Sequence, residues 1–138
     1  MYLLDTNVIS ELRRRDRANP GVTAFFRQLT EQKAHTYLSV ITIGELRRGV
    51  NLIQYRGDIA QAKLLETWLQ TILDQYADHI LEFGKEEAQI WGRLRAPHPE
   101  NALDKQIAAT ALIYGFTLVT RNIKDFIATG VILHNPYD

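Results

Sequence analysis

Four acidic residues that lie far apart in the chain have the types and the spacing for metal-dependent chemistry: Asp5, Glu45, Asp104 and Asp125. Carboxylates are the ligands that Mg²⁺ and Mn²⁺ prefer, whereas Zn²⁺ sites are built mainly from cysteine and histidine. The chain has no cysteine, and no two of its four histidines stand at the spacing of ligands on one helix. If the four acids converge, we therefore expect them to hold Mg²⁺ or Mn²⁺.

Each acid also has a structural interpretation, and the local sequence leaves both interpretations open. Asp5 precedes a helical pattern and fits a helix N-cap, whose side chain accepts hydrogen bonds from the first amides. Glu45 completes a capping-box pattern that begins at Thr42. Asp104 suits the first turn of a helix, where a negative charge favours the positive end of the helix dipole. Asp125 suits the cap of a short turn.

The elements that must position these acids alternate along the chain. Short β-rich or apolar runs predict strands, and apolar residues at helical spacing predict helices. Strands that alternate with helices indicate βαβ units, so we expect the α/β class, with a small parallel sheet and helices on both faces. The predicted strands are 1–4, 36–41, 79–83, 116–120 and 131–134, and the predicted helices are 8–12, 41–53, 58–76, 86–96 and 101–115.

A parallel sheet brings the acids to one edge, because the turns after the carboxyl ends of its strands gather where such sheets bind ligands. Asp5, Glu45 and Asp125 each follow a predicted strand. The helix near Asp104 follows a proline-rich loop at 96–101, which leaves the chain room to return to that edge. Two carboxylates about 4 Å apart repel by roughly 4 kcal/mol at an effective dielectric near 20, so such a cluster needs a cation. A cation held there activates water for displacement at phosphorus, which is the chemistry of a phosphodiester hydrolase.

Composition and charge limit the class of protein. A chain of 138 residues with 46% hydrophobic and 23% charged residues suits one globular domain, 1–138. The 16 basic and 16 acidic residues balance, which argues against a general binder of polyanions. We expect no membrane span and no signal peptide, and the lack of cysteine is compatible with the cytoplasmic location that we expect. Basic residues also cluster near the acids in sequence. A single cluster suits a solvated helix face, but together they predict a rim that binds the phosphates of a nucleic acid: Arg13, Arg14, Arg47, Arg48, Arg121 and Lys124.

Four short motifs, in this order and at these intervals, resemble the PIN-domain ribonucleases: LLDTNVISEL, SVITIGELRRGV, LDKQIAATAL and LVTRNIKDF. The chain is most similar to the VapC-type toxins of toxin–antitoxin pairs. Asn135-Pro136-Tyr137 is also similar to the ending of some members of the FitB-like branch. The resemblance implies a three-layer α/β/α fold, a Mg²⁺- or Mn²⁺-dependent endoribonuclease and a homodimer. It also implies a cognate antitoxin that occludes the site, with operator DNA bound only through the antitoxin complex.

The resemblance also implies roles for individual residues. Asp5, Glu45 and Asp104 match the acidic triad that holds the metal. Asn7 matches the polar residue beside the first acid, and we expect it to orient that acid. Thr120 matches the hydroxyl after the fourth strand, which is predicted to contact water or phosphate.

One position departs from the family pattern. Many relatives carry an acid where this chain has Asn122, and asparagine is a weaker metal ligand. Asp125 is the candidate to share or replace that ligand. The departure leaves open whether the site holds one metal ion or two.

Parts of the sequence pattern are also compatible with two other functions. A phosphoacceptor receiver domain usually has an acidic pair after its first strand and a lysine after its fifth. Here only Asp5 follows the first strand, and Arg121 with Asn122 follows 116–120. The other alternative is a catalytically weak binding module that acts with its antitoxin on DNA. The presence of all three acids of the triad disfavours it, and a neutral chain predicts weak binding to nucleic acid by itself.

Overall fold

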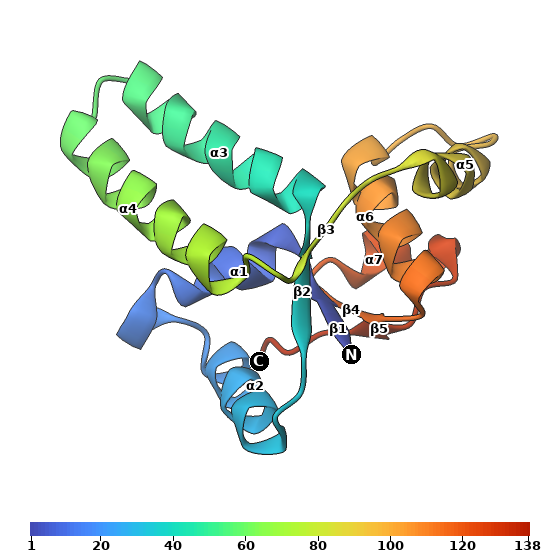
Figure 1. Ribbon diagram of the computed structural model, residues 1–138, viewed down its shortest axis with the longest axis horizontal. Helices are drawn as coiled ribbons and strands as arrows, with labels where there is room; N and C mark the ends of the chain where they lie inside the picture. Colours follow the sequence, from blue (N-terminus) through green and yellow to red (C-terminus); the bar gives the residue numbers. More distant parts are fainter.

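A five-stranded, fully parallel sheet lies at the centre of the computed structural model, which describes residues 1–138 (Figure 1). The strand order is β3-β2-β1-β4-β5, so β1 lies in the middle and β4 lies directly beside it. This arrangement confirms the predicted α/β class and the parallel sheet. The strands are β1 (Tyr2–Leu4), β2 (Thr36–Ser39), β3 (Ile80–Leu81), β4 (Thr117–Val119) and β5 (Leu133–His134).

Helices cover both faces of the sheet, and each face has its own apolar core. Consecutive residues of a strand point to opposite faces. Leu4 accordingly packs with residues of α1 to α4, whereas Leu3 packs with residues of α6 and α7. The helices are α1 (Thr6–Leu12), α2 (Pro20–Gln32), α3 (Val40–Tyr55), α4 (Ile59–Gln75), α5 (Lys85–Leu94), α6 (Ala102–Tyr114) and α7 (Ile123–Phe126), with short 3₁₀ turns at Arg15–Arg17 and Ile127–Thr129.

The boundary between β2 and α3 differs from the prediction. The strand ends at Ser39, and the helix begins at Val40, so the β-branched pair Val40-Ile41 belongs to the helix. Ser39 is the N-cap, because its hydroxyl accepts a 3.0 Å hydrogen bond from the amide of Ile41. The predicted capping box at Thr42 is therefore wrong, and Glu45 lies in the second turn of α3.

Helix α2 was not predicted, although its start carries clear signals. Asn19 caps the helix, since its side-chain oxygen accepts hydrogen bonds from the amides of Gly21 and Val22. Pro20 occupies the first helical position, where its missing N–H is not needed. The helix buries Val22, Phe25 and Leu29 against the core.

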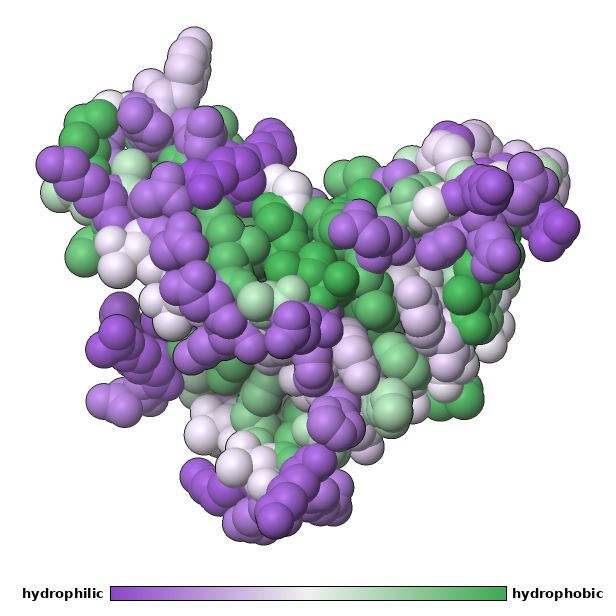
Figure 2. Space-filling model, viewed as in Figure 1, coloured by the Kyte–Doolittle hydropathy of each residue, from purple (hydrophilic) through white to green (hydrophobic).

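The two longest helices, α3 and α4, pack side by side as an antiparallel pair that projects to the upper left in Figure 1. The space-filling view shows a notch between this pair and the lobe formed by α5 and α6, with apolar residues gathered at its base (Figure 2). No helix of the chain is both long enough and apolar enough to cross a membrane.

Candidate active site

Asp5 lies directly after β1 and is almost completely buried, with 3% of its surface exposed. It is the N-cap of α1, because the amide of Thr6 donates a 2.8 Å hydrogen bond to Oδ1. The hydroxyl of Thr120 donates to Oδ2 at 2.7 Å, and Nδ2 of Asn7 donates to the same oxygen at 3.1 Å. Burial raises the pKa of Asp5, although the bonds from Thr120 and Thr6 oppose the rise. The capping role predicted for Asp5 is therefore present, together with a bond from Thr120, which only the folded sheet can bring to it.

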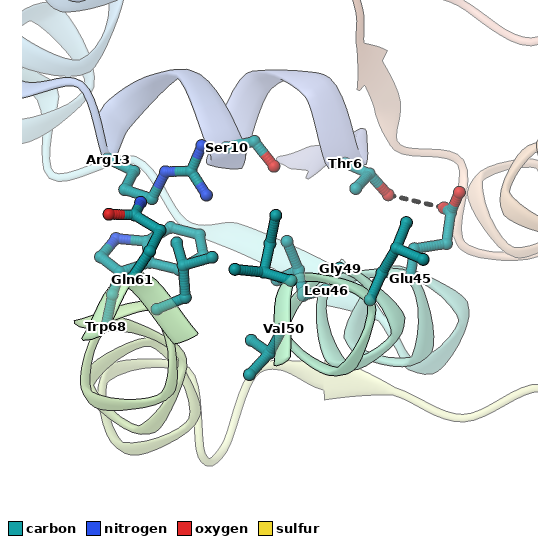
Figure 3. A pocket seen from close by; sticks show the side chains of 12 residues that line it. Thr6, Ser10, Arg13, Glu45, Leu46, Gly49, Val50, Gln61 and Trp68 are labelled. Atoms are coloured by element: carbon teal, nitrogen blue, oxygen red, sulfur yellow. Dashed lines mark hydrogen bonds between the residues drawn. The ribbon is translucent and has the colours of Figure 1, made fainter. Parts of the chain in front are cut away.

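Thr6 holds Glu45 at the same edge of the sheet. The Thr6 hydroxyl donates a 2.7 Å hydrogen bond to Oε1 of Glu45, and it also lies 3.1 Å from the hydroxyl of Thr42 (Figure 3). No role is predicted for Thr6 from the sequence, where its only signal is its place immediately after Asp5 and before the predicted helix 8–12.

Asp104 lies in the first turn of α6, as predicted, and its side chain makes no hydrogen bond. Its pKa is raised to about 6, first because its burial disfavours the charged form and then because of the nearby charges of Asp5, Asp125 and Glu45. Charges act on one another in this way only when they lie close together in a medium that screens them poorly. Asp5, Asp125 and Glu45 therefore lie near enough to Asp104 for their charges to raise its pKa.

The acids do not form a ready-made metal cage. No three acidic, histidine or cysteine side chains lie close enough together to hold one ion. The donor set still suits a hard divalent cation, because the ligands on offer are carboxylate oxygens and the carboxylates of Asp104 and Asp125 are free of hydrogen bonds. Binding one ion would require these side chains to move closer together. Burial first, and then the nearby charges of the other acids, raise the pKa of Asp104.

The residues around the acids differ in the contacts that they make. Asn7 bridges two segments, since its Nδ2 donates to Asp5 and its Oδ1 accepts a 3.2 Å hydrogen bond from the amide of Arg121. Asn122 contributes its backbone amide, which donates to the Thr120 hydroxyl at 3.0 Å. Asp125 is exposed on α7 and lines a cavity of about 360 Å³ with Lys124.

The basic residues differ in what they contact. Arg13 and Arg14 line an open hollow of about 630 Å³ with Arg15, Arg17 and residues of α4. Arg47 is instead paired with Glu66 of α4 through two hydrogen bonds of 2.7 and 2.9 Å. An RNA contact by Arg47 would therefore first have to break that pair. Arg48 is exposed, and the Arg121 guanidinium lies over the ring of Tyr137 at 5.3 Å.

A cavity of about 310 Å³ extends from Glu45 to Arg13 (Figure 3), and it shares Arg13 and Trp68 with the basic hollow. Thr6 and Glu45 line one end, and Arg13 and Trp68 line the other. Arg13 lies over the Trp68 ring at 5.9 Å and also lines the basic hollow. Apolar residues of α3 and α4 line the middle of the cavity.

A family model for the PIN domain matches residues 2–131. The chain belongs to the PIN-domain family. It is 38% identical over 142 residues to toxin FitB of Neisseria gonorrhoeae, with 99% of each chain covered. It is 32% identical over 145 residues to the VapC ribonuclease Y4jK of Sinorhizobium fredii, with 100% of this chain and 99% of that protein covered. The crystal structure of FitAcB from N. gonorrhoeae matches with a TM-score of 0.84 at 38% identity, over 99% of this chain and 98% of that chain.

Membership in the PIN-domain family confirms the resemblance on which the triad was assigned. It also replaces the receiver-domain interpretation, which rested on an acidic Mg²⁺ site in a doubly wound sheet. In this PIN domain, Asp5, Glu45 and Asp104 lie at the carboxyl edge of the sheet, where parallel α/β proteins bind their ligands. The segment 132–138 lies outside the matched region.

Proposed function

We propose that this PIN domain is the toxin of a toxin–antitoxin pair and that it acts as a Mg²⁺- or Mn²⁺-dependent endoribonuclease. The single observation that carries the proposal is the convergence of four acids from four distant segments at one sheet edge. Repulsion between the acids destabilises the metal-free fold, and a bound cation would remove that repulsion. The names of the relatives, a toxin and a ribonuclease, support the same conclusion.

The metal ligands in this proposal are Asp5, Glu45 and Asp104, with Asp125 or the side chain of Asn122 as an auxiliary ligand. When bound, the cation lowers the pKa of water and neutralises charge at the scissile phosphate. Thr6 fixes one oxygen of Glu45, and Thr120 with Asn7 fixes Oδ2 of Asp5. These hydrogen bonds orient the ligands before the cation and RNA bind, so less conformational entropy is lost on binding.

The basic hollow supplies the electrostatic attraction for RNA in this proposal. Its lining has no carboxylate, and Arg13, Arg15 and Arg17 have none within 4 Å, whereas Arg14 is paired with Glu11 at 3.2 Å. Nearby Asp16 is exposed and is the one acid in this turn. Arginine binds phosphate with a planar fork of donors, so the hollow fits a backbone phosphate some distance from the cleaved one. Further phosphate contacts are proposed for Arg48, Arg121 and Lys124.

The proposed partners follow from charge and from the open site. An antitoxin that covers the acids would keep RNA from the metal and silence the enzyme. A chain with 16 basic and 16 acidic residues attracts DNA weakly, so operator binding would come mainly from the antitoxin. A homodimer is proposed as the working form of the toxin.

The alternative of a catalytically weak binding module has one observation in its favour, which is the lack of three ligands close enough to hold an ion. Cleavage of total cellular RNA decides between the two functions. The wild type would be incubated with Mg²⁺ or Mn²⁺, with chelator, and beside Asp104→Asn. The matched control is Asp78→Asn, which neutralises an exposed acid far from the site.

We expect discrete fragments that require metal, persist in the control variant and vanish in Asp104→Asn. Cleavage that survives excess chelator would refute the metal-dependent mechanism. Failure of the metal-loaded, antitoxin-free protein to cleave RNA would instead favour the binding module.

A further inference from the structure

The segment 135–138 lies against the start of α2, and the side chain of Tyr137 reaches α1. The mark for the end of the chain in Figure 1 accordingly lies next to α2. Pro136 is buried, and Tyr137 packs partly against the core cluster that contains Leu4 and Val8. The amide of Asp138 donates a 3.1 Å hydrogen bond to the same Asn19 oxygen that caps α2. The segment is therefore bound to the body of the domain.

A glycine makes this close approach possible. A Cβ atom on Gly21 would lie 2.2 Å from the carbonyl oxygen of Pro136 and 2.9 Å from the amide nitrogen of Asp138. Real Cβ atoms do not approach a backbone so closely, so a side chain at Gly21 would displace the segment. The position is helical and alanine suits it otherwise, which means that only the contact with 136–138 requires glycine here.

Tyr137 connects the segment to Asn7, which contacts Asp5. Its hydroxyl donates a 2.9 Å hydrogen bond to the backbone oxygen of Asn7. Its ring lies under the guanidinium of Arg121 at 5.3 Å, and the Arg121 amide donates to Oδ1 of Asn7. One residue thus holds Asn7 directly through the backbone and indirectly through Arg121.

Asn7 has its side-chain orientation set by these contacts. With Oδ1 turned to the Arg121 amide, Nδ2 is left to face Oδ2 of Asp5 at 3.1 Å. If Asn7 turned over, a carbonyl oxygen would face the carboxylate, which is repulsive. The bonds that fix Oδ1 therefore also fix the donor that Asp5 receives.

We propose that the segment 135–138 is a strap whose Tyr137 positions Asn7, and through it the metal ligand Asp5. The role rests on the proposed function, since Asp5 is a metal ligand only there. Tyr137 touches no reacting atom in this scheme and is a positioning residue. The strap lies outside the region that the PIN-domain model matches, which is 2–131.

Three variants test the proposal. Tyr137→Phe keeps the ring under Arg121 and removes only the bond to Asn7. Gly21→Ala displaces the strap from a site that touches neither Asn7 nor Asp5. Gly92→Ala is the matched control, because it is also a helical glycine whose added Cβ meets nothing within 4 Å. Each would be measured for Mn²⁺ affinity by calorimetry, RNA cleavage, thermal stability, and hydrogen exchange of the Arg121 amide and the Asn7 side-chain amide.

If the strap positions Asn7, Tyr137→Phe and Gly21→Ala should both speed hydrogen exchange at Arg121 and Asn7. Both should also weaken Mn²⁺ binding about 10-fold, which is the lower end of the effect of residues that orient metal ligands. The turnover number should fall while KM is unchanged. Gly92→Ala should match the wild type in exchange, Mn²⁺ affinity and RNA cleavage, and alanine's higher helix propensity should raise its thermal stability. Unchanged exchange in both strap variants would overturn the proposal whether or not metal binds. A wild type that neither binds Mn²⁺ nor cleaves RNA would overturn the proposed function, and with it the strap's catalytic purpose. A functional wild type with equal Mn²⁺ affinity in Tyr137→Phe and Gly21→Ala would overturn the strap alone.

Discussion

The hydroxyl of Thr6 donates a 2.7 Å hydrogen bond to Oε1 of Glu45, which ties the first turn of α1 to the second turn of α3. The backbone amide of the same residue donates to Oδ1 of Asp5. Two acids that are 40 positions apart in the sequence are thus held through one threonine. Thr6 is therefore as much part of the site as the acids that the sequence singled out.

Removing the Thr6 hydroxyl should loosen Glu45. Thr6→Val keeps the branched shape but leaves the half-buried carboxylate without its donor, so we expect a loss of about 1–2 kcal/mol in the free energy of unfolding. Under the proposed function, metal affinity or activity should fall roughly 10-fold or more. Urea unfolding and RNA cleavage measure the two effects. Thr6→Ser keeps the donor and should retain most of the activity, and equal losses in both variants would contradict the assignment.

The raised pKa of Asp104 makes the stability of the metal-free protein depend on pH. Its pKa is about 6 in the folded protein against an ordinary value of 3.8, so between these values the folded state binds the proton more tightly. The stability that protonation contributes is complete below about pH 4, and it is lost as the pH rises through about 6. We therefore expect stability from this group to fall with rising pH across that window.

Urea unfolding of the wild type and Asp104→Asn between pH 4 and pH 7 measures this dependence. Asparagine stays neutral, so the variant should be the more stable protein above pH 6, by on the order of 1 kcal/mol after allowance for the partial exposure of the side chain. The difference should shrink toward pH 4, where Asp104 itself is protonated. A difference that does not change with pH would mean that folding does not raise the pKa of Asp104.

Divalent metal should stabilise the protein, because an ion that binds only the folded state shifts the equilibrium toward it. At 100 times the dissociation constant, Mg²⁺ or Mn²⁺ should add about 2.7 kcal/mol to the free energy of unfolding. Thermal melts with Mn²⁺, with chelator, and with NaCl at equal ionic strength measure the effect. The gain should vanish with chelator and be largely absent in Asp104→Asn, and an equal gain from NaCl would indicate general screening.

RNA binding by the basic hollow should depend on salt. Each phosphate contact with single-stranded RNA contributes about 0.7 to the slope of log affinity against log salt concentration, so Arg13→Ala and Arg17→Ala should each reduce the slope by roughly that amount. Arg47→Ala is the matched control, because Glu66 already occupies its guanidinium. Binding would be measured with Asp104→Asn protein, so that the RNA stays intact. A larger effect of Arg47→Ala than of Arg13→Ala would place the RNA elsewhere.

The sequence predicted the parts of the fold that depend on local pattern. Asp5 and Asp104 were placed at the carboxyl edge of the sheet because a parallel sheet gathers the ends of its strands, whatever the details of packing. The end of α6 at Gly115 was also predicted, because glycine adopts without strain the left-handed conformation that ends many helices. Gly115 has that conformation, with φ of 69°.

The missed features depend on contacts between distant residues or on local signals that compete. Val40 and Ile41 favour a strand by composition, and only the Ser39 hydroxyl shows that the helix has begun. Nothing near Thr6 in the sequence reveals that Glu45 lies beside it. The close approach of Gly21 to Pro136 likewise joins positions that no local pattern relates.

The hydrogen bond between Thr120 and Asp5 spans 115 positions of the chain. Because β1 pairs with both β2 and β4, Asp5 lacks its shortest hydrogen bond until the ribosome has synthesised and released residues through Thr120. Contacts so distant in sequence also form late in folding, since a long loop must close first. Under the proposed function, the site of a nascent chain therefore stays incomplete until nearly the whole domain has emerged from the ribosome.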